Sequence, residues 1–259
     1  MVAALPLGVG LAVVSVLLPA TRGPSDPTTL AIRIATGVVI SALTLAVIAV
    51  LVGYVDRKRM SDVGLTSIRK GWRLAVWGGI VWTVPAAAMF GVLALLGAPL
   101  AVTVSASEMV RTVILLLLAV LITEALPEEA VFRGYITSAL GAVASGWWVI
   151  VIQALMFTLF AGLLRQNWNP ADLSLFLTMG IVFGYLRMIT GSVWISIGFH
   201  TAFQTGAQLV LTHDAIEFAG GTGMAMLALG IIPFSVAAFL VGSTGIPRII
   251  HPVTAAEAD

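Results

Sequence analysis

The residues best suited to chemistry lie in one short segment, Thr123–Gly134, which reads TEALPEEAVFRG. It places three glutamates and one arginine at the end of the apolar run ILLLLAVLIT. An ionisable side chain at membrane depth costs ~2.5–3.5 kcal/mol on insertion scales, so such residues normally face the bundle interior and have partners. If the apolar run spans a membrane, the segment predicts a polar site between helices.

Helical spacing separates these charges into two groups. Glu129 and Arg133 are four residues apart, in the order that favours an ion pair. Glu124 and Glu128 are also four apart and share a different face. Pro127 removes a backbone donor and is expected to bend the helix just before the glutamates. Glu128 then has no local partner, and such a carboxylate can act as a general base. The alternative is a structural ion-pair cluster at the membrane edge.

A second polar position is His200, in the stretch SVWISIGFHTAFQTG. Gln204 follows four residues later and shares its helix face. If the glutamate helix continues to Leu140, Glu128 lies ~18 Å from that end, and His200 lies ~14 Å from Gly191. The carboxylate and the imidazole can therefore meet at one level and bind or activate a water. The alternative is that His200 is a hydrogen-bonded core residue.

Composition places the chain in the membrane class. Of its 259 residues, 59% are hydrophobic and 10% are charged, whereas a soluble domain has about 25% charged residues. The net charge of +1 gives no basis for nucleic-acid binding. The absence of cysteine excludes disulfides, thiolate metal sites and cysteine nucleophiles.

Runs of about 20 apolar residues predict an all-α, polytopic bundle of about eight transmembrane helices. The first run is interpreted as a retained span rather than a removed signal, and Arg33 at the edge of the second run is expected to snorkel. Residues 1–108 are predicted to form N-terminal helices with a basic loop, and residues 109–245 a membrane domain that holds the site. The eight runs lie at Met1–Thr21, Ile34–Val55, Leu74–Ser107, Met109 onward, Trp147–Leu164, Leu173–Arg187, Gly191–Leu211 and Gly223–Val241.

The distribution of basic residues predicts the orientation. The connection between the second and third runs carries six of the thirteen lysines and arginines, so it is placed in the cytoplasm. With eight spans, both termini also face the cytoplasm, in a bacterial-type plasma membrane. The lipid bilayer is thus a predicted partner.

Three stretches carry a resemblance to a known family. EEAVFRG, which begins at Glu128, looks like its first signature, and GYLRMITGSVWISIGFHTAFQ resembles its last. The earlier DVGLTSIRKG resembles a common lead-in, so the match covers roughly Asp62–Gln204. The chain thus resembles the CPBP family, which comprises type II CAAX prenyl endopeptidases and bacteriocin-processing proteins and is also called the Abi family of intramembrane metalloproteases.

The resemblance implies a metalloendopeptidase that cleaves a membrane-associated peptide or protein near the cytosolic face. Glu128 would activate the attacking water, with Glu129 and Arg133 in support. His200 would orient that water or, together with Glu128, hold a metal that is usually taken to be zinc. Gln204 would occupy the position of an asparagine thought to stabilise the oxyanion.

The sequence departs from the family pattern at two positions. In LMFTLFAGL, Phe157 aligns with a family phenylalanine, and the histidine expected four residues later is Ala161. Gln204 replaces asparagine and is one methylene longer. Catalytic zinc usually has three protein ligands, so the loss at Ala161 leaves Glu128 and His200 as the remaining candidates.

Three functional hypotheses follow from this pattern. Either the metal is absent, or Glu124 replaces the missing ligand in an active peptidase; His213 and His251 are predicted to lie too far away. The second hypothesis is a catalytically inactive member that acts as a membrane scaffold or immunity-type binding protein. A proton relay through Glu124, Glu128 and His200 is the third, but no inverted repeat supports a transporter.

Overall fold

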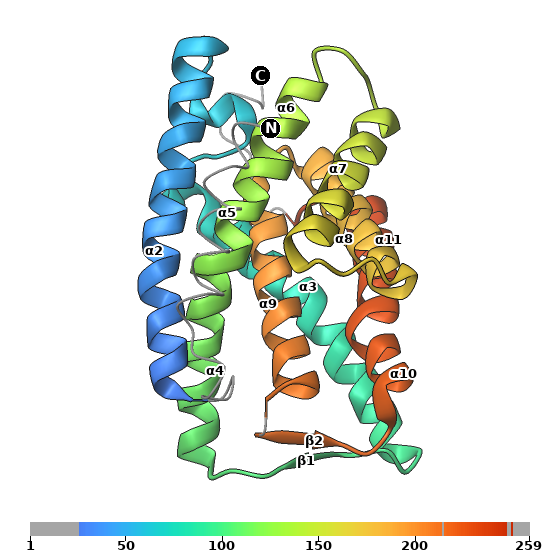
Figure 1. The fold of residues 1–259 in the computed structure, drawn as a ribbon. Helices are drawn as coiled ribbons and strands as arrows, with labels where there is room; N and C mark the ends of the chain where they lie inside the picture. The colour runs from blue at the N-terminus through green and yellow to red at the C-terminus, as the bar shows by residue number, and fades with distance from the viewer. Residues whose placement is uncertain (1–25, 214, 248–249, 251–259) are drawn as a thin grey trace.

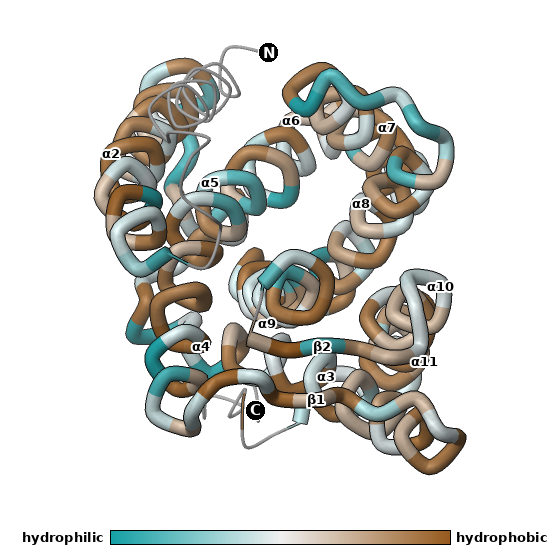
Figure 2. Tube along the Cα trace, turned by 60° about the horizontal axis from the view of Figure 1, so that its bottom comes forward, coloured by the Kyte–Doolittle hydropathy of each residue, from teal (hydrophilic) through white to brown (hydrophobic). Residues whose placement is uncertain are grey.

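The computed structural model describes residues 26–213, 215–247 and 250, and it shows a bundle of helices with one small sheet (Figure 1). The predicted first span, Met1–Thr21, and His251 lie outside these residues. One end of the bundle carries the connection between α2 and α3, and the opposite end carries the two strands. Helix α9 lies in the interior of the bundle in both views (Figures 1 and 2).

Several of the long helices contain π-helical turns, so one rod combines more than one element. The described elements are α2 (Pro27–Val50), a π-helical turn (Leu51–Val55), a 3-10 turn (Met60–Val63), α3 (Ile68–Leu95), β1 (Leu100–Val102), α4 (Ala106–Val120), a π-helical turn (Leu121–Ala125), α5 (Leu126–Glu129), a π-helical turn (Ala130–Ile136), α6 (Thr137–Leu140), α7 (Trp147–Arg165), α8 (Pro170–Thr190), α9 (Val193–Leu211), β2 (Ile216–Phe218), α10 (Gly221–Met226), a π-helical turn (Leu227–Ile231) and α11 (Ile232–Thr244).

Six helices within the described residues are long and apolar enough to cross a membrane. They correspond to six of the predicted spans, so the predicted polytopic helical fold is confirmed, while the count of eight stays a prediction. The predicted seventh span is the 19-residue helix α9, which carries His200 and three glutamines and is less apolar. The six helices are Pro27–Val55, Met60–Leu95, Ala106–Leu140, Trp147–Arg165, Pro170–Thr190 and Gly221–Thr244.

The outward faces of these helices are apolar. Val38, Val84 and Leu159 are each more than half exposed, although a soluble protein would bury most such side chains. Figure 2 shows hydrophobic residues along the outer helices. This surface suits lipid chains, so the protein is an integral membrane protein.

Capping residues set the bounds of the helices near the site. Asp26 accepts a hydrogen bond from the backbone N–H of Thr29 at 2.9 Å, and Pro27 follows at the first helical position, so α2 begins earlier than the apolar run suggested. At the strand end, β1 pairs antiparallel with β2, with Leu100 opposite Phe218. The predicted uncharged connection after the third span therefore contains a strand.

Small residues allow α3 and α9 to pack closely. A Cβ atom added at Gly198 would lie 1.7 Å from the carbonyl oxygen of Ala75. One added at Gly78 would lie 2.1 Å from the carbonyl oxygen of Ile195. Both neighbours are backbone atoms, which cannot rotate away. These glycines therefore fix the position of α9, and with it the position of His200.

We expect Gly198→Ala to lower the free energy of unfolding by about 1–3 kcal/mol or more, because overpacking forces α3 and α9 apart. Thermal unfolding in detergent measures the loss. Gly79→Ala is the matched control at the same interface, since its nearest neighbour would lie 3.7 Å away. That variant is expected to be neutral or up to about 1 kcal/mol more stable, because alanine favours a helix. Equal stability of the two variants would contradict the close-packing account.

Candidate active site

The helix that carries the glutamates is irregular on both sides of Pro127. A π-helical turn precedes it at Leu121–Ala125, and another follows at Ala130–Ile136. Such turns disturb the regular backbone ladder and often occur at functional sites. Ser41 on α2 donates a hydrogen bond to the carbonyl oxygen of Ile122 at 2.5 Å, which satisfies one backbone group there. The irregularity expected at Pro127 is therefore present and is braced by α2.

Glu129, Arg133 and His200 form a layer that is completely buried, with side chains 0% exposed. The Nη1 atom of Arg133 donates to Oε1 of Glu129 at 3.0 Å, so the predicted pair is present. The Nδ1 atom of His200 lies 2.9 Å from the same oxygen. Arg133 also donates through Nη2 to the carbonyl oxygen of Met179 at 3.2 Å. The layer thus joins the glutamate helix to α8 and α9.

Aromatic rings enclose this layer. The guanidinium carbon of Arg133 lies 4.4 Å from the ring centroid of Phe157 and 5.1 Å from that of Phe183. Such cation–π contacts are worth about 2 kcal/mol when desolvated. Among the described residues, Oε2 of Glu129 and Nε2 of His200 have no hydrogen-bond partner. The layer therefore retains one acceptor and one ring nitrogen for a further group.

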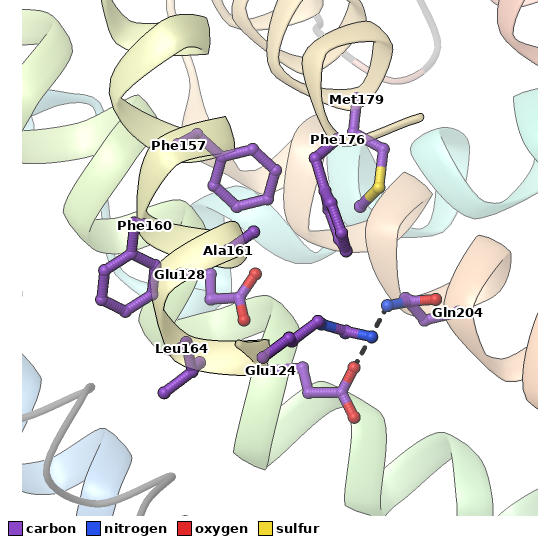
Figure 3. Close-up of a pocket in the computed structure, with 10 residues that line it drawn as sticks. Glu124, Glu128, Phe157, Phe160, Ala161, Leu164, Phe176, Met179 and Gln204 are labelled. Atoms are coloured by element: carbon purple, nitrogen blue, oxygen red, sulfur yellow. Dashed lines mark hydrogen bonds between the residues drawn. The ribbon is translucent and has the colours of Figure 1, made fainter. Parts of the chain in front are cut away.

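A cavity of about 130 Å³ lies beside the buried layer. Because a water needs about 10–15 Å³ of such space, the cavity can hold several. Figure 3 shows Glu124, Glu128 and Ala161 around it. Glu128 is half-buried and makes no hydrogen bond or ion pair with any described residue. The full lining comprises Glu124, Glu128, Phe157, Phe160, Ala161, Leu164, Arg165, Phe176, Met179 and Gln204.

Glu124, in contrast, is held by three side chains. Arg33 donates to it at 2.8 Å, Gln208 at 3.2 Å and Gln204 at 3.3 Å. Arg33 also donates to Oε1 of Gln208 at 3.1 Å. The expectation that Arg33 snorkels is therefore wrong, because its guanidinium turns inward to an opposite charge.

Sequence reasoning missed Arg33 and Gln208 as site residues. Gln208 lies four residues after Gln204 and eight after His200, so it continues the polar face of α9. Arg33 is a charge near the start of an apolar helix, which is itself a signal for an interior partner. Both residues were therefore detectable from spacing and depth.

The predicted metal ligands do not form a complete set. Glu128 and His200 are not hydrogen-bonded to each other, and His200 bonds Glu129 instead. Nowhere in the described part of the chain do three histidine or carboxylate side chains gather closely enough to hold a metal ion. His213 lies beside a different cavity, near β2. The donors present therefore fall short of the three-ligand pattern of zinc enzymes.

Two of the sequence stretches that resemble the family contact each other and hold α9. The side chain of Ser192 accepts from the backbone N–H of Trp194 at 3.3 Å and caps the helix. The N–H of Val193 donates to the carbonyl oxygen of Gly64 at 3.1 Å. The indole N–H of Trp194 donates to the carbonyl oxygen of Thr66, also at 3.1 Å. These stretches therefore position His200 rather than supply reactive groups.

Residues 110–206 match the family model described as "Type II CAAX prenyl endopeptidase Rce1-like". This segment belongs to the Rce1-like family. It runs from α4 to α9 and contains the glutamate segment, the buried layer and Gln204, but neither Arg33 nor Gln208. The recognition made from the sequence is confirmed, and at family level the chain is an intramembrane protease of this type. No curated protein and no solved structure matches the chain.

Proposed function

We propose that this Rce1-like chain is an endopeptidase that cleaves a membrane-associated peptide with a water activated by Glu128. The observation that carries the proposal is the contrast between neighbouring carboxylates. Glu124 and Glu129 are held by cationic and polar side chains, whereas Glu128 lines the cavity without a partner among the described residues. A free carboxylate beside space for water is what general-base chemistry requires.

The reaction can be written with the chain's own residues. Glu128 accepts a proton from a water in the cavity, and the water oxygen bonds to the carbonyl carbon of the scissile peptide. The tetrahedral intermediate then carries a negative oxygen, to which the Nε2 of Gln204 is positioned to donate. Glu128 returns the proton to the amide nitrogen as the carbon–nitrogen bond breaks. The products are a carboxylate and an amine.

The buried layer has a positioning role in this proposal. Glu129 follows Glu128 directly in the chain and is fixed by Arg133 and His200 at 3.0 and 2.9 Å. Because adjacent residues on a helix point in different directions, anchoring Glu129 in the core helps to keep Glu128 toward the cavity.

The family resemblance implies zinc, for which Glu128 and His200 are the candidate ligands. A bound zinc would polarise the water or the peptide carbonyl. The position where the family pattern has a third ligand is Ala161, which lines the cavity. The residues present therefore do not complete the site, and the proposed steps do not depend on a metal.

We expect Ala161→His to bind zinc in about one equivalent if the cavity is a metal site that lacks one ligand, because three ligands are then available. Elemental analysis of the purified protein in detergent measures the gain over the unsubstituted chain. The matched control is Ala142→His, which places the same side chain in the exposed connection before α7 and is expected to bind none. Zinc contents that do not differ between the two variants would contradict this interpretation of Ala161.

The second candidate function is that of an inactive family member that binds a peptide or partner protein. Ala161 in place of a histidine is the observation that favours it. Mass-spectrometric profiling of a peptide library, incubated with the purified protein in liposomes, separates the two candidates. New cleavage products that require Glu128 support the peptidase. An absence of products from a folded protein would support the binding role.

A further inference from the structure

The cavity beside Glu128 adjoins a larger groove. The groove has a volume of about 530 Å³ and shares Glu124, Arg165 and Gln204 with the cavity. From Gln204 it follows α9 to Leu211 and Thr212, which are exposed. Its other walls are largely apolar. The remaining lining residues are Leu175, Phe203, Ala207, Gln208, Met226 and Leu229.

The site is closed in the opposite direction. Phe132, Arg133, Phe183 and Ser196 are each 0–1% exposed and fill the space beyond Glu129 and His200. Ser196 donates to the carbonyl oxygen of Phe183 at 3.0 Å, which ties α9 to α8 in this layer. Within the described residues, the approach to Glu128 is therefore from the strand end of the bundle.

The two ends of the bundle differ in charge. Arg57, Lys58 and Arg59 are exposed in the connection between α2 and α3, at the end opposite the strands (Figure 1). Arg69 and Lys70 begin α3 at the same end and are also exposed. Basic loops of this kind lie in the cytoplasm. The mouth of the groove is therefore on the extracytoplasmic side.

We propose that the groove receives an extended peptide segment from the extracytoplasmic side and guides it to Glu128. This rests on the proposed peptidase function and reverses the cytosolic approach expected from the sequence. From Gln204 to Thr212 the groove runs about 12 Å along α9, which accommodates about four extended residues. Its apolar walls suit apolar side chains, and the amide of Gln208 can bond a peptide backbone.

The test uses cysteine accessibility, for which the chain is suited because it has no cysteine of its own. Three single variants are labelled with a charged, membrane-impermeant maleimide, in intact cells and after permeabilisation. Ala207→Cys reports the groove, Lys58→Cys the basic loop, and Ser196→Cys the closed layer. Each replacement is small or exposed, and recovery of folded protein is checked by gel filtration.

Ala207→Cys is expected to label in intact cells, and Lys58→Cys only after permeabilisation. Ala207→Cys is also expected to label at least about tenfold faster than Ser196→Cys, because a buried thiol reacts only when the structure opens. Added unstructured, apolar hexapeptides should slow labelling at Ala207→Cys and leave Lys58→Cys unchanged.

Three results would overturn the proposal. Labelling of Ala207→Cys only after permeabilisation would place the groove on the cytoplasmic side. No labelling at Ala207→Cys under either condition would indicate a groove closed or filled by lipid. Labelling that hexapeptides leave unchanged would exclude a peptide occupant. Because labelling needs no cleavage, a labelled groove in a protein that cleaves no peptide would instead count against the peptidase function alone.

Discussion

Glu128→Gln is expected to lower kcat for peptide cleavage by at least about 100-fold, the lower end of the usual contribution of a general base. Glutamine has nearly the same shape as glutamate but cannot accept the proton of the attacking water. Glu128 has no hydrogen-bond or ion-pair partner among the described residues, so the substitution breaks no contact that stabilises the fold. Substrate binding, and therefore KM, should change little, because the lost interaction acts in the transition state.

Initial rates on a peptide found by library profiling measure this effect. Glu108→Gln is the matched control, since it lies on the same long helix and its carboxylate is exposed, 3.8 Å from Arg111. That variant should keep full activity. If Glu124→Gln abolished cleavage while Glu128→Gln did not, the role of base would belong to Glu124. The contrast between a held and a free carboxylate would then be the wrong guide to the reactive group.

Local spacing predicted the parts of this site that lie within one helix. Glu129 and Arg133 are four residues apart, and the pair is present at 3.0 Å. The helix through the glutamates was expected to continue to Leu140, and it ends there. Such features follow from helix geometry and from the cost of a lone charge among apolar residues.

Spacing could not predict which carboxylate faces which helix. His200 bonds Glu129 rather than Glu128, although both lie near the predicted level. A regular helix turns about 100° per residue, and each π-helical turn changes that angle for every residue that follows. The turn at Leu121–Ala125 therefore alters the directions of both glutamates, and its presence depends on contacts with α2 that the local sequence does not reveal.

The inward position of Arg33 shows the same limit. Alone, an arginine near a helix end can reach the membrane surface, so snorkelling was a reasonable expectation. In the bundle, Glu124 and Gln208 offer it a charged and an amide oxygen at 2.8 and 3.1 Å. The paired arrangement depends on three helices meeting, which no single-helix pattern contains.

Replacement of Arg133 is expected to have the largest effect on stability. Arg133→Met removes the cationic partner of Glu129, whose side chain is 0% exposed. Breaking a buried pair by removing one partner costs about 3–5 kcal/mol, because the remaining charge stays buried. Chemical unfolding in mixed micelles should show this loss in the free energy of unfolding. Arg59→Met is the control, since its ion pair with Asp62 is exposed and such pairs contribute about 0–1 kcal/mol.

The double variant Glu129→Gln with Arg133→Met tests whether the uncompensated charge is the cause. It removes both charges and leaves a neutral amide beside His200. Most of the stability lost in Arg133→Met should therefore return, because replacing both members of a buried pair is often nearly neutral. A double variant as unstable as Arg133→Met would show instead that Arg133 stabilises the bundle mainly by packing between Phe157 and Phe183. The coupling energy from this cycle separates the two causes.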